Sequence, residues 1–208
     1  MSLNLSSERL LISITGMSGV GKNTIVDALL AKDSQLQKLV TATTRPPRTG
    51  EAHGIDKYFL SEADFVKRIA EDDVLEHVTY HGQYYGTLVS VVKDGMLRGH
   101  DIIGGGTYPG VAQFHLRLPE NHLSFLILPP HKQAIEDRLN YRAQESGESI
   151  EKIQERLRVN AEDLANLHTP DYVFQGPDMV GSKKNDYDHV IINDNLTEAV
   201  NTVHDLIQ

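Results

Sequence analysis

Apolar, β-branched runs of strand length alternate with helical patterns along the whole chain. The first run, residues 10–15 (LLISIT), leads into a glycine-rich stretch, and apolar residues then recur at helical spacing at Ile25, Ala28, Leu29 and Leu30. Further strands are predicted at residues 39–43, 75–80, 101–103, 123–128 and 190–192. This alternation is typical of an α/β protein with a mainly parallel sheet, in which ligands bind beyond the carboxyl ends of the strands.

Length and composition predict one domain. The 208 residues, 39% of them hydrophobic, are enough for a single core with small mobile subdomains attached. Residues 174–187 (FQGPDMVGSKKNDY) are the best loop candidate, because turn-forming residues cluster there.

The charge balance narrows the possible partners. Twenty Lys and Arg against 29 Asp and Glu give a net charge of -9, which argues against a broad nucleic-acid surface. Positive charge that does cluster should therefore face a small anion.

The chain has no cysteine, and none of its apolar stretches approaches the length of a membrane span, so a soluble cytoplasmic protein is expected. The ten histidines show no paired ligand spacing, and no intrinsic metal site is predicted.

Residues 16–22 (GMSGVGK) fit the pattern G-x-x-x-x-G-K between a strand and a helix. Such glycines let successive backbone N–H groups converge on phosphate oxygens, the helix N-terminus adds a favourable dipole, and the lysine reaches the terminal phosphates. Asn23 stands where Ser or Thr normally offers a hydroxyl to Mg²⁺, so metal coordination is less well defined than phosphate binding. The predicted phosphate-binding residues are Gly16, Ser18, Gly19, Val20, Gly21, Lys22, Asn23 and Thr24.

A second cationic feature is the segment TTRPPRTGE, residues 43–51. Its prolines favour a polyproline II conformation, in which side chains three residues apart emerge on the same side, about 9 Å apart. Arg45 and Arg48 are therefore expected to point the same way and to clasp a phosphate with little ordering cost. The alternative for these residues alone is a solvated proline-rich loop.

Several motifs in register resemble the guanylate kinase family. They are GMSGVGKNT, TATTRPPRTGE with HGIDKYF, LEHVTYHGQYYGT, LILPP and YDHVIINDNL, and the resemblance runs over residues 10–207. It implies a P-loop core that holds ATP (residues 8–40, 98–140 and 159–208), a GMP-binding subdomain (residues 41–97) and a helical lid (residues 141–158).

The resemblance also implies an activity and roles for particular residues. Guanylate kinases transfer the γ-phosphate of ATP, with Mg²⁺, to GMP, giving ADP and GDP. A carboxylate opposite guanine makes chemical sense, because it accepts from two neighbouring N–H donors that adenine does not present. The implied GMP-binding residues are Thr41, Arg45, Arg48, Glu51, Glu76, Tyr85 and Thr87. The implied catalytic residues are Lys22, Arg45, Arg142 and Arg156.

The lid is expected between the helix KQAIEDRLNYR and a second helix that begins near Ser149. Arg142 and Arg156 match the family's lid arginines, although their spacing is three residues longer than expected. Such arginines neutralise charge on the transferring phosphoryl group. For Arg138 the sequence favours a plain position on the exposed face of an amphipathic helix.

The chain departs from the family pattern at several positions. Gly105 and Thr107 stand where the family has acids, and Lys57 stands where it has a phosphate-binding tyrosine. Together with Asn23, the missing acids leave Mg²⁺ handling and the identity of the acceptor open. Three hypotheses remain: an ATP:GMP phosphotransferase, a related P-loop kinase acting on another acceptor such as ribose bisphosphate, and a non-catalytic guanylate kinase-like binding module. The phosphotransferase is preferred to the related kinase because the implied guanine-reading residues are present. The binding module ranks last because the glycine-rich loop with Lys22 is intact.

Overall fold

The structure is a computed structural model that describes residues 3, 8–146, 149–166, 173–175, 178–180 and 187–208. The chain forms two compact units. The first contains residues 1–13 and 30–123, and the second contains residues 14–29 and 124–208. Strand β1 (Leu11–Thr15) begins in the first unit and ends in the second.

The first unit contains a four-stranded sheet in the order β4-β3-β6-β5. Helix α2 packs its buried Phe65 against this sheet, in a cluster with Ala42, Val74 and Leu88. Ser61 caps the helix by accepting from the backbone N–H of Asp64, which satisfies one of the unpaired donors at a helix N-terminus. The elements are β2 (Leu36–Lys38), β3 (Ala42–Thr43), β4 (Tyr58–Phe59), α2 (Glu62–Ala70), β5 (Val74–Tyr80), β6 (Gln83–Leu88), α3 (Val89–Leu97), β7 (Asp101–Gly105) and α4 (Tyr108–Arg117).

The main core of the first unit gathers residues from β1, β5, β7, α3 and α4. It includes Leu11, Leu75, Met96, Ile102 and Phe114, all buried. Helix α4 packs on β5 and helix α3 packs on β7. The N-terminus of α4 and the middle of β5 are thereby held against each other, which is where the polar residues described below lie.

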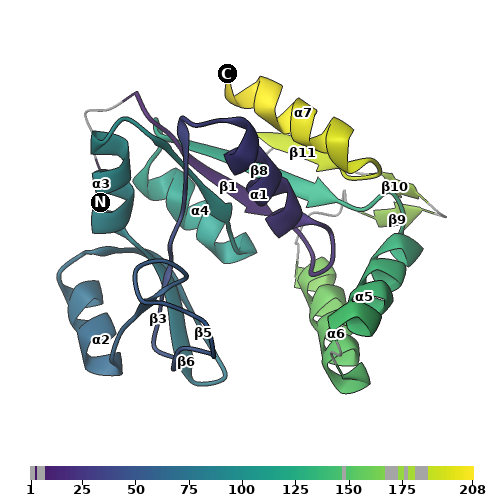
Figure 1. The fold of residues 1–208 in the computed structure, drawn as a ribbon, viewed down its shortest axis with the longest axis horizontal. Coiled ribbons are helices and arrows are strands. Elements are labelled where there is room, and N and C mark those ends of the chain that lie inside the picture. Colours follow the sequence, from purple (N-terminus) through teal and green to yellow (C-terminus); the bar gives the residue numbers. More distant parts are fainter. Residues whose placement is uncertain (1–2, 4–7, 147–148, 167–172, 176–177, 181–186) are drawn as a thin grey trace. The chain divides into compact units, whose positions relative to one another are not determined.

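The second unit carries the glycine-rich loop. Strand β11 runs parallel to β8, and helix α7, capped by Asn195, packs on β11. Helices α5 and α6 lie side by side (Figure 1). The elements are α1 (Lys22–Lys32, residues 22–29 of which belong to this unit), β8 (His122–Leu128, residues 124–128 of which belong to it), α5 (Lys132–Ser146), α6 (Ile150–Asn166), β9 (Val173–Gln175), β10 (Asp178–Val180), β11 (His189–Ile192) and α7 (Leu196–Ile207).

The predicted fold class is confirmed. The larger sheet has the strand order β11-β8-β1-β7-β2, and both β11 with β8 and β2 with β7 pair in parallel. Along the chain, at least one helix occurs between each strand of this sheet and the next strand of the same sheet, as the alternating pattern predicts.

Two local predictions are wrong. Residues 39–41 lie outside any strand because the chain changes sheets there: Leu39 N–H still donates to Ile103 O of β7, whereas Thr41 O already accepts from Tyr58 N–H of β4. Within the predicted loop 174–187, strands β9 and β10 pair as an antiparallel hairpin, although turn-forming residues surround them. Residues 176–177 and 181–186 of that loop lie outside the described residues. Strand β6 was not among the predicted strands.

The two neighbouring glycines of β7 provide a packing test. A Cβ on Gly104 would lie 2.6 Å from Leu39 Cβ, whereas a Cβ on Gly105 would meet nothing within 4 Å. Gly104→Ala should therefore lower the free energy of unfolding by about 1–3 kcal/mol through overpacking. Gly105→Ala is the matched control and should leave it unchanged or slightly raised. Urea denaturation of both variants measures the difference, and equal stabilities would contradict the packing role of Gly104.

Candidate active site

The glycine-rich loop of the second unit joins the end of β1 to the start of α1 at Lys22. Its shape depends on glycine at two positions of close approach. Gly16 has a φ of +145°, and a Cβ there would lie 2.4 Å from Ile127 O; Gly21 has a φ of +102°, and a Cβ there would lie 2.5 Å from Asn193 Nδ2. Any larger residue would be strained and would clash at either position.

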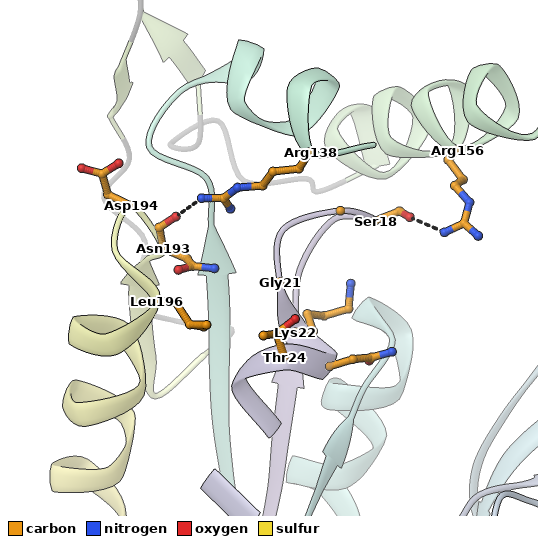
Figure 2. Close-up of a pocket in the computed structure, with 11 residues that line it drawn as sticks. Ser18, Gly21, Lys22, Thr24, Arg138, Arg156, Asn193, Asp194 and Leu196 are labelled. Carbon is orange, nitrogen blue, oxygen red and sulfur yellow. Dashed lines mark hydrogen bonds between the residues drawn. The ribbon is translucent and has the colours of Figure 1, made fainter. Parts of the chain in front are cut away.

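A cavity of about 530 Å³ opens beside this loop (Figure 2). Among the described residues, three cationic side chains from α1, α5 and α6 line it together with one acid, Asp194, so the cavity is suited to a polyanion. Most of the predicted phosphate-binding residues line it, while Val20 is buried and Gly16 lies at the base of the loop. The lining residues are Ser18, Gly19, Gly21, Lys22, Asn23, Thr24, Arg138, Arg156, Asn193, Asp194 and Leu196.

Side-chain donors occupy the loop's carbonyl oxygens. The Nζ of Lys22 donates to Gly16 O at 2.6 Å and to Met17 O at 2.9 Å. Asn193 Nδ2 donates to Val20 O at 2.8 Å. Carbonyl oxygens that are held by donors in this way repel an anion less, which favours anion binding by the backbone N–H groups of a glycine-rich loop.

The expectation for Arg138 is wrong. Its guanidinium does not stand on an exposed helix face: Nη1 donates to Val20 O at 3.2 Å. Nη2 donates to Asn193 O at 2.7 Å, the bond drawn in Figure 2. Helical periodicity led to a wrong prediction for Arg138, because an arginine side chain is long enough to reach a neighbouring loop from the edge of a helix. Arg138 therefore belongs to the cavity.

Among the described residues of helix α6, Arg156 and Asn160 contact the middle of the loop. Arg156 Nη1 donates to Ser18 Oγ at 3.3 Å (Figure 2). Asn160, 4% exposed, accepts from Ser18 N–H at 2.8 Å and donates to Ser18 O at 3.0 Å, as a neighbouring strand would. Arg142 lies in α5, and its side chain is outside the described part of the structure. The helix predicted to begin near Ser149 begins at Ile150, and α5 continues through Ser146 into the segment expected to be a loop.

Sequence reasoning missed Asn160 and Asn193. Asn193 directly follows β11, and the rule that ligands lie at the carboxyl ends of parallel strands is a signal that points to it. Asn160 has a weaker signal, which is a buried amide on an otherwise amphipathic helix.

A second polar cluster lies in the first unit, on the four-stranded sheet. Ala42 of β3 pairs with Tyr58 and Gly86, and Glu76 of β5 pairs with Thr87. Continuing this register by one residue aligns Lys57, Thr41, Thr87 and Glu76 in one row across the sheet. We call these four residues the polar row.

Two hydrogen bonds join the members of the polar row in pairs. Lys57 Nζ donates to Thr41 Oγ1 at 2.5 Å, and Thr87 Oγ1 donates to Glu76 Oε1 at 2.9 Å. Burial raises the pKa of Glu76 above its usual value, against the opposing effects of the Thr87 hydrogen bond and the Lys57 charge. The first turn of α4 comes close to this carboxylate, because a Cβ on Gly110 would lie 3.1 Å from Glu76 Oε2.

The arginine segment lies beside the polar row and is clamped by an acid. Arg45 forms a bidentate pair with Glu51 at 2.6 and 2.7 Å, and the backbone N–H of Arg48 donates to the same carboxylate at 2.8 Å. These bonds lower the pKa of Glu51 to about 2. The hydrogen bonds to Glu51 raise the pKa of Arg45, and Tyr85 makes a smaller contribution in the same direction. The Arg45 guanidinium also lies 5.5 Å from the centre of the Phe59 ring. Glu51 therefore orders the segment around Arg45, whereas residues 46–50 are exposed.

The positions that depart from the family pattern have local roles. Thr107 caps α4, where its hydroxyl accepts from Gly110 N–H at 3.1 Å. Gly105 is exposed and has open space around it.

Among the described residues, no group of three or more His, Asp and Glu side chains is placed to hold a metal. No helix that the structure describes has the length and apolar character needed to cross a membrane.

Taken together, the parallel sheet and the lysine-bearing loop define an α/β protein of the P-loop kinase class. A family model described as guanylate kinase matches residues 7–208, and this chain belongs to the guanylate kinase family. The guanylate kinase of Methylobacillus flagellatus is 40% identical over 163 residues, covering 78% of this chain and 79% of the relative. That of Symbiobacterium thermophilum is 35% identical over 191 residues, covering 92% and 81%. A crystal structure of guanylate kinase from Anaplasma phagocytophilum shares the fold, with a TM-score of 0.65 and 21% identity over 96% of this chain and 84% of that one.

The two bonds from Asn160 predict a stability effect that is coupled to nucleotide binding. Asn160→Ala would leave the N–H and C=O of Ser18 without their partner, at a cost of about 1–3 kcal/mol in unfolding free energy. It should also weaken ATP binding roughly tenfold, because the loop loses its support. Gln154→Ala, at an exposed site on the same helix, is the control. Thermal melts and ATP titrations that do not distinguish the two variants would show that Asn160 does not support the loop.

Proposed function

We propose that this protein transfers the γ-phosphate of ATP to GMP or dGMP, giving ADP and GDP or dGDP. The observation that carries the proposal is the polar row, which places a carboxylate and two hydroxyls side by side on one sheet, next to a clamped arginine segment. Membership of the guanylate kinase family supports it independently.

The cavity of the second unit is the proposed ATP site. Backbone N–H groups of the loop hold the phosphates, and Lys22 moves from its present carbonyl partners to the terminal phosphates. Arg138, Arg142 and Arg156 neutralise charge that develops on the transferring phosphoryl group. Positioning and electrostatics of this kind supply nearly all of the catalysis in phosphoryl transfer.

The four-stranded sheet of the first unit carries the proposed GMP site. Glu76 accepts hydrogen bonds from the N1–H and the 2-amino group of guanine, and Thr41 and Thr87 complete the base contacts. Arg45, Arg48 and Tyr85 hold the 5′-phosphate, and Glu51 fixes the arginine that it clamps. Adenine presents an acceptor at N1, so it would place two acceptors opposite each other at Glu76.

Magnesium enters as part of the substrate MgATP. Asn23 and Thr24 line the cavity and carry an amide oxygen and a hydroxyl, and oxygen ligands are what this cation prefers. The proposed partners are these small molecules alone, without nucleic acid or membrane. A cytoplasmic location fits this role and the cysteine-free sequence. Nothing in the described residues favours a ribose bisphosphate acceptor or a non-catalytic binding module.

A coupled assay of ADP release tests the proposal directly. With MgATP, the protein should turn over GMP and dGMP, and reject AMP by about 10⁴-fold in kcat/KM, because the mismatch leaves buried polar groups unpaired. Lys22→Ala should nearly abolish transfer to GMP while GMP still binds. Comparable turnover of AMP and GMP, or activity confined to ribose phosphates, would overturn the assignment.

The raised pKa of Glu76 predicts opposite effects of one substitution on function and stability. Glu76→Gln should cost about 100-fold or more in GMP kcat/KM, because an amide presents a donor where guanine also presents one. The folded protein binds a proton at Glu76 more tightly than the unfolded chain does, so the ionised group opposes folding near neutral pH. Glu76→Gln should therefore match or exceed the parent in melting temperature at pH 7.

The pH profile follows from the same group. GMP kcat/KM should fall as the pH drops towards the raised pKa, where the carboxylate becomes protonated. A Glu76→Gln variant that keeps parental GMP activity, or one that unfolds at much lower temperature, would contradict this role.

A further inference from the structure

Lys57 is the member of the polar row to which the proposed function gives no task. It lies directly before β4 and is partly buried, and its Nζ donates to Thr41 Oγ1. Burial, together with Arg45, lowers its pKa below the usual value for a lysine. The charges of Arg45 and Lys38 lower the pKa of Lys57, and those of Glu51 and Glu76 raise it.

The chemistry of the two groups fixes the direction of their hydrogen bond. An ammonium has three donors and no acceptor, so Thr41 Oγ1 is the acceptor in its contact with Lys57. The one hydroxyl hydrogen of Thr41 must then point away from the ammonium. Thr41 is held as a hydrogen-bond donor towards any ligand placed over the polar row.

In the other pair of the row, Thr87 and Glu76, the threonine hydroxyl is the donor and not the acceptor. Thr87 donates its one hydroxyl hydrogen to Glu76 Oε1. The Thr87 oxygen and the Glu76 carboxylate can therefore act only as acceptors towards a ligand. The row therefore presents a donor at its Lys57 end and acceptors at its Glu76 end. Guanine matches this order, with an acceptor at O6 and donors at N1 and the 2-amino group. Adenine has a donor at N6 and an acceptor at N1, which is the reverse.

We infer that Lys57 is a positioning residue that sets the Thr41 hydroxyl as a donor to the 6-oxygen of the purine, and so helps to select 6-oxo over 6-amino acceptors. This inference rests on the proposed function, since it names a specificity device within the same GMP site. Lys57 acts through Thr41 and need not touch the substrate.

A different role for Lys57, as a ligand of the acceptor phosphate, predicts different kinetics. GMP and AMP carry the same phosphate, so loss of a phosphate ligand would reduce kcat/KM for both by the same factor. Loss of a group that orients Thr41 would instead change the ratio between the two acceptors. The ratio is an internal control, because both acceptors are measured with one preparation of protein.

The test compares Lys57→Met with the parent on GMP, IMP and AMP. IMP keeps O6 and N1–H but lacks the 2-amino group, so it reports on the Thr41 end of the row. Lys57→Met should reduce kcat/KM for GMP and IMP by roughly 10- to 100-fold, with a much smaller loss for AMP. Lys57→Arg, which keeps the donors, should retain most of the preference. Lys93→Met, at an exposed lysine of the same unit, should match the parent.

A double-mutant cycle with Thr41→Val completes the test. In that background the hydroxyl is gone, so Lys57→Met should leave the GMP:AMP and IMP:AMP ratios unchanged. An equal loss for all three acceptors, or the same change in ratio with and without Thr41, would overturn the role of Lys57 while the proposed function stands. A parent protein that does not prefer GMP to AMP would overturn both.

Discussion

The pairing of β6 with β3 on one side and with β5 on the other determines which side chains a bound base would meet. Because side chains alternate between the faces of a strand, a slip of one residue in either pairing would turn Thr41, Thr87 or Glu76 to the other face. The opposite face is the apolar one, where Ala42 packs with Phe65. Burial of that face therefore fixes the register of the polar face. In the proposed function, specificity for the base therefore depends on the core of the first unit.

In the second unit, the glycine-rich loop is held in one shape while the cavity beside it stays open. The loop's carbonyl oxygens are tied to side chains from other elements: Arg138 from α5, Asn160 from α6 and Asn193 after β11. Each of these residues also adjoins or lines the cavity beside the loop, so the elements that support the loop are also the ones that surround the cavity. Substitutions there are expected to affect stability and nucleotide affinity together.

The sequence predicts the position of the glycine-rich loop correctly, because the pattern lies in consecutive residues between a strand and a helix. The polar row is different: its members are separated by 11 to 46 positions and become neighbours only through strand register, so local patterns do not reveal it. Resemblance to the guanylate kinase family pointed to Thr41, Glu76 and Thr87, but not to Lys57, where the chain departs from that family. Arg138 and Asn160 were misjudged or missed because helical periodicity describes a face and not the loop that a side chain reaches.

The central claim is that the polar row reads guanine and that the glycine-rich loop holds ATP, each within its own unit. Amide chemical shifts in a ¹⁵N-labelled protein test it most directly. GMP alone should shift the resonances of Thr41 and Thr87, AMP at the same concentration should not, and ADP should shift those of Gly19 and Gly21. Equal shifts of the row by AMP and GMP, or GMP shifts confined to the loop glycines, would contradict the account.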